Sequence, residues 1–341
     1  MNRSMLGIID ATTYKEEIKD LAQERSMAAI PFAGRYRLID FVLSNMVNSG
    51  IKSVGIFPKY RYRSLMDHLG SGKHWDLNRK RDGLFFFPSP HLYDEYHEFG
   101  SFKQFSDHID YFLRSRQKYA VITNSYTVAN IDFQKVLDYH IDMGCDLTEV
   151  CQNGKSLQMY IMSTELLMDL IQQSAYSSYK TLHDVVTSPE KFTICQYEHQ
   201  DYVAVIDSIQ KYYKHSLEIL QPEIWQSLFS KDRPIFTKVK DEPPTRYGKQ
   251  SRVRNCFIAN GSIIEGTVEN SIIFRAVHIG KNTVIKNSII MQKSQIGERC
   301  SLNYCILDKD VKIGDDMNLL GDKNDPYVVH KGTIQGVLMN T

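Results

Sequence analysis

A short repeat in the last third of the chain is the strongest constraint on its fold. From about residue 253 onward, aliphatic residues recur at intervals close to multiples of six with a one-residue slip, and Gly or Asn often follows them. The repeat positions are Ile279, Ile285, Ile296, Leu302 and Ile313, with apolar pairs at 263–264, 272–273, 289–290 and 306–307 between them. Hexapeptide repeats of this kind fold as a parallel β-helix, a prism with flat faces. We expect every aliphatic residue to point into the prism, and Gly or Asn to occupy corners with positive φ.

The first two-thirds of the chain alternates between strand-like and helix-like segments. Apolar runs at 6–9, 51–57, 119–123, 146–150 and 157–162 predict strands, and helical spacing recurs at 37–49, 133–143, 164–173 and 208–220. This alternation predicts a doubly wound, mainly parallel α/β sheet with ligands at the carboxyl ends of its strands. Because Pro243, Pro244 and Gly248 mark a connecting segment, we predict two domains, residues 1–235 and 236–341.

The composition argues against several function classes. Lys and Arg number 41 and Asp and Glu number 40, so the net charge of +1 gives no strong field toward nucleic acid or membrane. The apolar stretch at the N-terminus is too short for a signal peptide and no long apolar run follows, so we expect a cytoplasmic protein. The six cysteines form no C-x-x-C pair, and we expect buried free thiols rather than disulfides or zinc.

Residues 31–51 carry the most specific motif of the chain. They read PFAGRYRLIDFVLSNMVNSGI. This segment resembles the glucose-1-phosphate adenylyltransferase family, which has P-F-G-G-K-Y-R-I-I-D-F-x-L-S-N-x-V-N-S-G-I at this place. Residues 59–65, 131–133 and 266–272 fit the same family, so the resemblance covers essentially the whole chain. It implies a nucleotidyltransferase-like domain followed by a left-handed β-helix, and an activity that joins ATP and glucose 1-phosphate into ADP-glucose and pyrophosphate.

Measured against that family, the chain lacks the phosphate-binding groups. The family's phosphate loop reads G-G-x-G-x-R, whereas residues 9–15 contain no glycine whose backbone could approach a triphosphate. Met27 stands where the family has a phosphate-binding lysine. The family's G-T-A-D motif is replaced at residues 100–103, and its E-K-P sugar-phosphate segment is absent.

The two aspartates that hold Mg²⁺ in the family are also missing. The first falls on Ser125 or, with a one-residue shift, on Tyr126, and the second falls on Val205. Asp207 lies close by, and its side chain would point the same way as that of Val205 at a different height. We therefore predict no catalytic residues and no metal site, with the losses at Met27, Ser125 and Val205.

These combined losses resemble the short, D-type subunit of some Gram-positive bacteria, which accompanies a catalytic paralogue. The resemblance implies a regulatory or stimulatory, catalytically deficient subunit in glycogen synthesis. It implies that this chain binds no cofactor and that Mg²⁺ is held by the catalytic partner. Because the open edges of a β-helix invite stacking with another chain, we expect a hetero-oligomer, a tetramer, without nucleic acid or membrane partners.

Arg35 and Arg37 are the candidate effector-binding residues. They lie just ahead of the helix expected to start near Leu38, where free amides and a guanidinium favour an anion. By the resemblance, Arg35 falls where the family places a cation that contacts phosphorylated sugar effectors. The alternative is that Arg35 only pairs with a nearby acid, Asp40 or Glu24.

Two other function classes stay open at this stage. One is a weakly active sugar-phosphate nucleotidyltransferase. The other is a hexapeptide acyltransferase in which His278 or His330 acts as a base toward a coenzyme A thioester. The acids at 308–310 and 315–316 suggest metal sites, although acids at prism corners commonly serve as turn residues.

Overall fold

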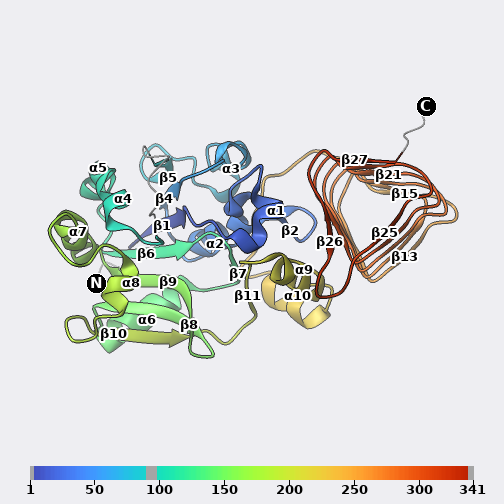
Figure 1. Cartoon of the computed structure of the whole chain (residues 1–341). Coiled ribbons are helices and arrows are strands. Elements are labelled where there is room, and N and C mark those ends of the chain that lie inside the picture. The colour runs from blue at the N-terminus through green and yellow to red at the C-terminus, as the bar shows by residue number, and fades with distance from the viewer. Residues whose placement is uncertain (1–3, 90–97, 337–341) are drawn as a thin grey trace.

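The computed structural model describes residues 4–89 and 98–336. An α/β domain and a β-helix lie side by side, with α9 and α10 next to the β-helix (Figure 1). Within the described residues, no helix is both long enough and apolar enough to span a membrane.

The α/β domain is built on one mixed sheet of seven strands in the order β10-β8-β9-β6-β1-β4-β5. Only β9 runs antiparallel to its neighbours β6 and β8. The strands are β1 (Met5–Ala11), β4 (Ser53–Pro58), β5 (Gly83–Phe86), β6 (Tyr119–Asn124), β8 (Leu147–Gln152), β9 (Lys155–Ser163) and β10 (Ile194–Glu198). Two short antiparallel ribbons accompany the sheet: β2 (Pro31–Phe32) with β3 (Tyr36–Arg37), and β7 (Thr127–Ala129) with β11 (Val203–Val205).

Helices cover both faces of this sheet, as the alternating sequence predicts. On one face the core is closed by α2 (Leu38–Asn48), α3 (Arg63–Leu69) and α6 (Phe133–Met143). On the other it is closed by α4 (Phe102–Ser106), α5 (Ile109–Arg114), α7 (Thr164–Gln173) and α8 (Leu182–Val186). The other helices are α1 (Lys19–Ala22), α9 (Ile209–Glu218), α10 (Pro222–Leu228) and the 3₁₀ turns η1 (Glu16–Ile18), η2 (Met27–Ala29) and η3 (Lys73–Trp75).

The C-terminal domain is a parallel β-helix with three flat faces. The first face holds β12 (Arg246–Tyr247), β15 (Ile263–Ile264), β18 (His278–Ile279), β21 (Gln295–Ile296), β24 (Lys312–Ile313) and β27 (Ile334–Gln335). The second holds β13 (Arg252–Arg254), β16 (Thr267–Glu269), β19 (Val284–Lys286), β22 (Ser301–Asn303) and β25 (Asn318–Leu320). The third holds β14 (Phe257–Ile258), β17 (Ile272–Ile273), β20 (Ile289–Ile290), β23 (Cys305–Leu307) and β26 (Tyr327–Val329).

One coil of the regular part takes 17 residues, because Thr267 pairs with Val284 and Val284 pairs with Ser301. Asn270 and Asn287 occupy corners with positive φ, as expected. Gly261 and Gly332 also have positive φ, but Gly280 does not: a Cβ there would lie 2.5 Å from the carbonyl oxygen of Gly297 in the next coil. Glycine is therefore needed here for close packing of coils rather than for positive φ.

The expectation that every aliphatic residue points into the prism is wrong for the third face. Ile273, Ile290 and Leu307 belong to the interior of the β-helix. Their neighbours Ile272, Ile289 and Ile306 belong to a separate core shared with α1, α2, α9 and α10. Since successive side chains of a strand point to opposite sides, each apolar pair serves both cores and fastens the β-helix to the α/β domain.

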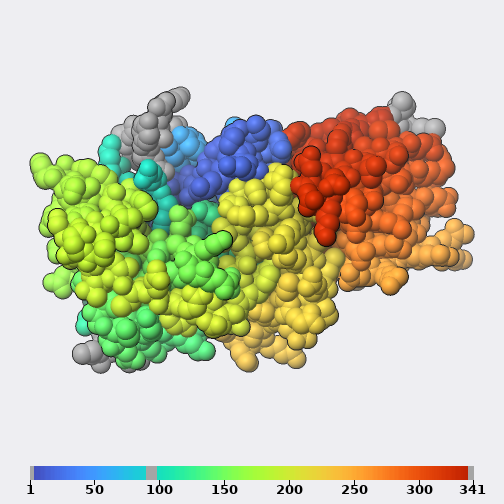
Figure 2. Space-filling model, turned by 60° about the horizontal axis from the view of Figure 1, so that its bottom comes forward, coloured from blue at the N-terminus to red at the C-terminus, as the bar shows by residue number. Residues whose placement is uncertain are grey.

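Polar contacts reinforce this junction. Arg25 Nη2 binds both carboxylate oxygens of Asp308 at 2.9 and 2.8 Å, and both side chains are almost fully buried. The Tyr213 hydroxyl donates to the carbonyl of Asn287 in the β-helix. In Figure 2 the last coils of the β-helix, in red, lie directly against the blue N-terminal segment and the yellow segment that includes α9 and α10. The limits of 1–235 and 236–341 for the two domains stay a prediction.

The prediction of free thiols is wrong for one pair of cysteines. Cys145 and Cys195 form a disulfide with their Cα atoms 6.0 Å apart. Cys145 precedes β8 and Cys195 lies in β10, which pairs with β8 in parallel, so the fold places them together. Cys151, Cys256, Cys300 and Cys305 are free.

Removing one partner of the buried pair tests how strongly it holds the junction. We expect Arg25→Met to lower the free energy of unfolding by about 3–5 kcal/mol, because it leaves the Asp308 carboxylate buried without a counter-charge. The control Lys211→Met breaks the exposed Lys211–Asp207 pair and should cost about 0–1 kcal/mol. Urea unfolding of both variants measures the difference, and equal effects would contradict a special role for Arg25.

Candidate functional site

The carboxyl ends of β1 and β6 form the place where the resemblance puts the phosphate loop. Asp10, at the end of β1, is completely buried. Its Oδ1 accepts hydrogen bonds from the Thr12 amide at 2.9 Å and the Thr12 hydroxyl at 2.6 Å, and its Oδ2 accepts one from the Gly100 amide at 2.7 Å. Backbone amides that could face a phosphate are therefore already bound to a carboxylate of the chain itself.

Beside this loop lies a cavity of about 230 Å³, lined by Thr12, Thr13, Tyr14, Arg25, Met27 and Arg61 among others. Met27, at the position of the family's lysine, is buried in the apolar junction core. Arg25 is committed to Asp308 and to the carbonyl of Leu21. Arg61 is exposed and makes only a 3.4 Å hydrogen bond to the carbonyl of Ala22, so its charge stays open to a phosphate.

The structure brings together the two positions of the missing metal ligands. Val205 pairs with Thr127 across the β7–β11 ribbon, and the Ile206 amide donates to the carbonyl of Tyr126. Ser125 is buried, and the Tyr126 hydroxyl donates to Oε1 of Gln158 at 2.5 Å. Burial raises the pKa of Tyr126, so its hydroxyl stays neutral.

The residues present at this place do not fit a Mg²⁺ site. Asp207 binds Lys211 at 2.6 Å, and Asp10 accepts the three hydrogen bonds described above. Within residues 4–89 and 98–336, no group of three or more His, Cys, Asp or Glu side chains is arranged to hold a metal ion. Mg²⁺ prefers several oxygen ligands in octahedral geometry, which Ser125, Tyr126 and Val205 do not supply.

A second cavity, of about 160 Å³, lies where the α/β domain meets the β-helix. We call it the basic pocket. Seven of its eleven lining residues are Lys or Arg: Arg35, Arg37, Lys238, Lys240, Arg275, Lys293 and Lys309, together with Tyr36, His68, Gln292 and the single acid Asp310. The pocket therefore unites the two arginines predicted from the sequence with five cations that the sequence analysis missed.

Three segments position these cations. Arg35 and Arg37 flank Tyr36 ahead of α2, and Lys238 and Lys240 lie on the connection from α10 to β12. Arg275, Lys293 and Lys309 come from three successive coils of the β-helix, where Gln292 and Lys309 follow Arg275 at the 17-residue coil spacing. That spacing was the available signal, because residues one coil apart stack about 4.8 Å from one another.

Few of these cations are neutralised. Arg37 donates to the carbonyl and hydroxyl oxygens of Ser64, and Lys238 donates to the carbonyl of Asp67. Across the described part of the chain, Arg35, Lys240, Arg275, Lys293 and Lys309 make no ion pair. A pocket of this kind favours an anion, because the ligand removes repulsion that the protein alone does not relieve.

Burial and mutual repulsion shift the acidities in the pocket. Burial, together with Arg37, Arg25 and Lys240, lowers the pKa of Lys309 to about 7, although Asp308 opposes the shift. Burial and Arg25 lower the pKa of Arg37 to about 10 against the opposing effect of Asp40. The pKa values of Lys240 and Arg275 are lowered for the same reasons. Lys309 is thus the pocket cation that loses its proton near neutral pH.

The alternative partners of Arg35 are engaged elsewhere. Asp40 accepts from the Arg37 amide at 3.0 Å and binds His68 at 2.6 Å, and Glu24 pairs with Lys331. Arg35 itself is exposed, with its guanidinium 5.0 Å from the centre of the Tyr36 ring. Its charge is therefore available to a ligand.

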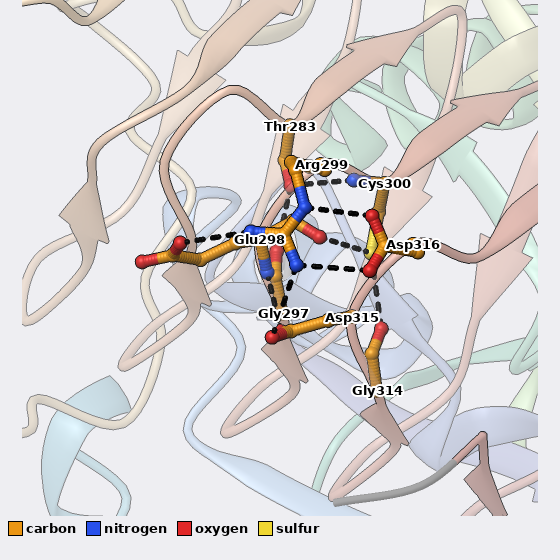
Figure 3. Close-up of polar contacts among 8 residues, drawn as sticks. All are labelled: Thr283, Gly297, Glu298, Arg299, Cys300, Gly314, Asp315 and Asp316. Atoms are coloured by element: carbon orange, nitrogen blue, oxygen red, sulfur yellow. Dashed lines mark hydrogen bonds and ion pairs between the residues drawn. The ribbon is translucent and has the colours of Figure 1, made fainter. Parts of the chain in front are cut away.

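The acids suggested as metal sites have structural partners. Figure 3 shows Arg299 reaching the carboxylate of Asp316 with two hydrogen bonds, of 2.7 and 2.9 Å, beside Asp315 and Glu298. Asp308 is bound to Arg25. Asp308, Asp315 and Asp316 thus serve the packing of domains or of corners, whereas Asp310 lines the basic pocket.

The two histidines do not lie in a site suited to coenzyme A. His278 is exposed on β18, 3.5 Å from Glu265. His330 lines a groove together with the acids Glu16, Glu17, Asp20, Asp322 and Asp325. Coenzyme A carries phosphates, which these carboxylates would repel.

Comparison with known proteins agrees with this architecture. Residues 16–156 match the nucleotidyl transferase family, and residues 242–339 match the GlmU-like C-terminal hexapeptide family. The glycogen biosynthesis protein GlgD of Bacillus subtilis is 63% identical over the whole of this chain and 99% of its own length. The GlgD of Geobacillus stearothermophilus is 58% identical over the full length of both chains.

The chain belongs to the GlgD family. Another relative from the same Bacillus subtilis strain is named glucose-1-phosphate adenylyltransferase, and it is 24% identical over 84% of this chain and 85% of its own length. The family is therefore related to that enzyme, as the motif at residues 31–51 indicates.

The pKa of Lys309 makes anion binding in the basic pocket depend on pH. A bound anion favours the protonated amine, so affinity is highest below the pKa of free Lys309 and falls as pH rises through 7. With sulfate, which stays fully ionised, we expect the dissociation constant to rise about tenfold from pH 6.5 to 8.5, the loss of one charged hydrogen bond. Isothermal titration calorimetry measures this change.

Two variants serve as controls for that experiment. Lys309→Arg keeps its charge throughout and should give tight, pH-independent binding, whereas Lys312→Met alters an exposed lysine and should behave like the wild type. A wild-type profile that is flat with pH would contradict the titration of Lys309.

Proposed function

We propose that this chain is a catalytically deficient, regulatory subunit that acts with a glucose-1-phosphate adenylyltransferase in glycogen synthesis. The observation that carries the proposal is the buried Asp10 carboxylate, which accepts hydrogen bonds from the Thr12 and Gly100 amides where the resemblance places the phosphate loop. An enzyme for nucleotidyl transfer needs donors and cations aimed at the developing phosphate charge. Here a buried carboxylate lies at that place beside Arg25 and Arg61, whereas seven cations line the basic pocket.

The partner is inferred from the relatives. Bacillus subtilis has both a GlgD and a glucose-1-phosphate adenylyltransferase, each related to this chain. A chain without its own catalytic groups gains a role if it changes the activity of such a paralogue. We place both proteins in the cytoplasm, where Mg²⁺ and ATP would be bound by the catalytic partner.

The first coil of the β-helix is the surface proposed for assembly. Its edge strands β12 and β13 leave Tyr247 53% exposed and Val253 39% exposed. Open strand edges with exposed apolar side chains favour pairing with another chain. We therefore propose a hetero-oligomer, a tetramer, formed through this domain.

The basic pocket supplies the regulation, with a phosphorylated sugar as the proposed effector. Arg35 and Arg37 contribute from the α/β domain, and Arg275 and Lys309 from the β-helix. A ligand that bridges the two domains changes how the β-helix, whose first coil is the proposed assembly surface, is held against the α/β domain. The basic pocket and the assembly surface are then two separate sites that share the β-helix, and allosteric coupling requires two such sites.

An assay of ADP-glucose formation tests whether catalysis belongs to the paralogue and regulation to this chain. We expect the purified chain alone to turn over at least about 10²–10³-fold more slowly than the catalytic paralogue, because several electrostatic stabilisers are missing. In the mixture, Arg35→Ala should leave the maximal rate unchanged and shift the effector concentration for half-response. Comparable turnover by the chain alone would identify it instead as an active nucleotidyltransferase, and an unchanged effector curve would remove Arg35 from the site.

Restoring one acid should not restore catalysis. We expect Ser125→Asp to remain inactive, because residues that act as a unit are not additive and Asp10, Met27 and Val205 are unchanged. Ser125→Ala is the matched control for damage to the fold. Clear ADP-glucose formation by the aspartate variant alone would show that the other losses are tolerated.

A further inference from the structure

Among the four lysines that line the basic pocket, Lys309 is the one that is partly buried and, within the described residues, has no hydrogen-bond or ion-pair partner for its amine. The nearby carboxylate of Asp308 is held by Arg25. The fold thus places the Lys309 amine in the wall of the cavity without binding it in a hydrogen bond or an ion pair.

Charged groups from several segments surround Lys309, and Arg35, His68 and Lys238 line the same pocket. Arg37 lies ahead of α2, Arg25 precedes η2, and Lys240 lies on the interdomain connection. Asp308 and Asp310 are its neighbours in the chain, and Lys293 and Arg275 lie in the preceding coils. The balance of these charges is strongly positive and opposes a further positive charge on the amine.

Burial and the surrounding cations favour the uncharged form of the Lys309 amine. With a pKa of about 7, roughly half of the Lys309 side chains carry a free amine at pH 7. An ordinary lysine, with a pKa near 10.4, has roughly 0.04% in that form. The same cations attract phosphate groups to the cavity.

We propose that Lys309 is an acylation site, at which a small acyl phosphate docks through its phosphate group and transfers its acyl group to Nζ. The lone pair of Nζ forms a bond to the carbonyl carbon, and the bond from that carbon to the phosphate oxygen breaks. Inorganic phosphate leaves with the electron pair, and the amine proton passes to water or to the leaving phosphate. The step involves no oxidation and needs no further reactant.

The modification would act on regulation. An acyl group removes the charge of Lys309 and fills part of a cavity of only about 160 Å³, so it should block anion binding. This consequence rests on the effector pocket of the proposed function, whereas the acylation itself requires only a phosphate-binding cavity and a free amine.

The test uses the full-length chain with acetyl phosphate, followed over time by peptide mass spectrometry. We expect Lys309 to be acetylated on the order of tenfold or more faster than the exposed Lys312. The rate at Lys309 should rise with pH and level off above about 8, and sulfate should protect Lys309 but not Lys312. Equal rates at the two lysines would overturn the proposal.

Two further measurements separate the possible failures. The N-hydroxysuccinimide ester of acetate carries no phosphate, so Arg275→Gln should slow labelling of Lys309 by acetyl phosphate far more than labelling by the ester. Calorimetry shows whether sulfate binds at all. Sulfate binding without selective acetylation would overturn the acylation site and leave the effector pocket standing, whereas no sulfate binding would overturn the pocket and the docking step together.

Discussion

The ion pair between Arg25 and Asp308 is the contact on which the arrangement of the two domains depends. Both side chains are almost completely buried, so their separation would leave two charges in an apolar junction. The outward-facing Ile272, Ile289 and Ile306 supply apolar burial around it. The ion pair fixes the position of the β-helix relative to the α/β domain, because only one position brings Asp308 to Arg25. Any site that is lined by residues from both domains therefore depends on this relative position of the two domains.

The basic pocket is the main consequence of that relative position. Lys309 follows Asp308 directly in the chain, so the coil that holds the ion pair also places Lys309 against Arg37 and Lys240. Collecting unpaired cations at a domain junction opposes folding, and burial lowers the pKa values of several of them. Proteins tolerate a local cost in folding free energy chiefly at functional sites. This favours the junction, rather than the loop after β1, as the functional site.

Periodicity was enough to predict the fold class of both parts of the chain, the longer helices and the central strands, but not the short helices or the two small ribbons. The helices at Leu38–Asn48 and Phe133–Met143 and the coils of the prism follow from spacing and caps alone. Arg35 and Arg37 could be predicted because they sit in a recognisable motif. Arg275, Lys293 and Lys309 required knowing which edge of the prism meets the other domain. Asp10 was missed because its partner, the Gly100 amide, lies 90 residues away in the sequence.

The position of negative charge gives the proposed split between catalysis and control a physical basis. A phosphate loop without its ligand leaves amides that need an acceptor. In this chain Asp10 supplies that acceptor permanently, so the loop is complete without a nucleotide. A triphosphate arriving at this loop would have to compete with the buried Asp10 carboxylate for the same amides. It would also be repelled by the negative charge of that carboxylate. The basic pocket has the opposite balance, since its cations have no internal acceptor of comparable strength. The α/β domain matches the nucleotidyl transferase family, while a group of cations without ion-pair partners among the described residues lies at its contact with the β-helix.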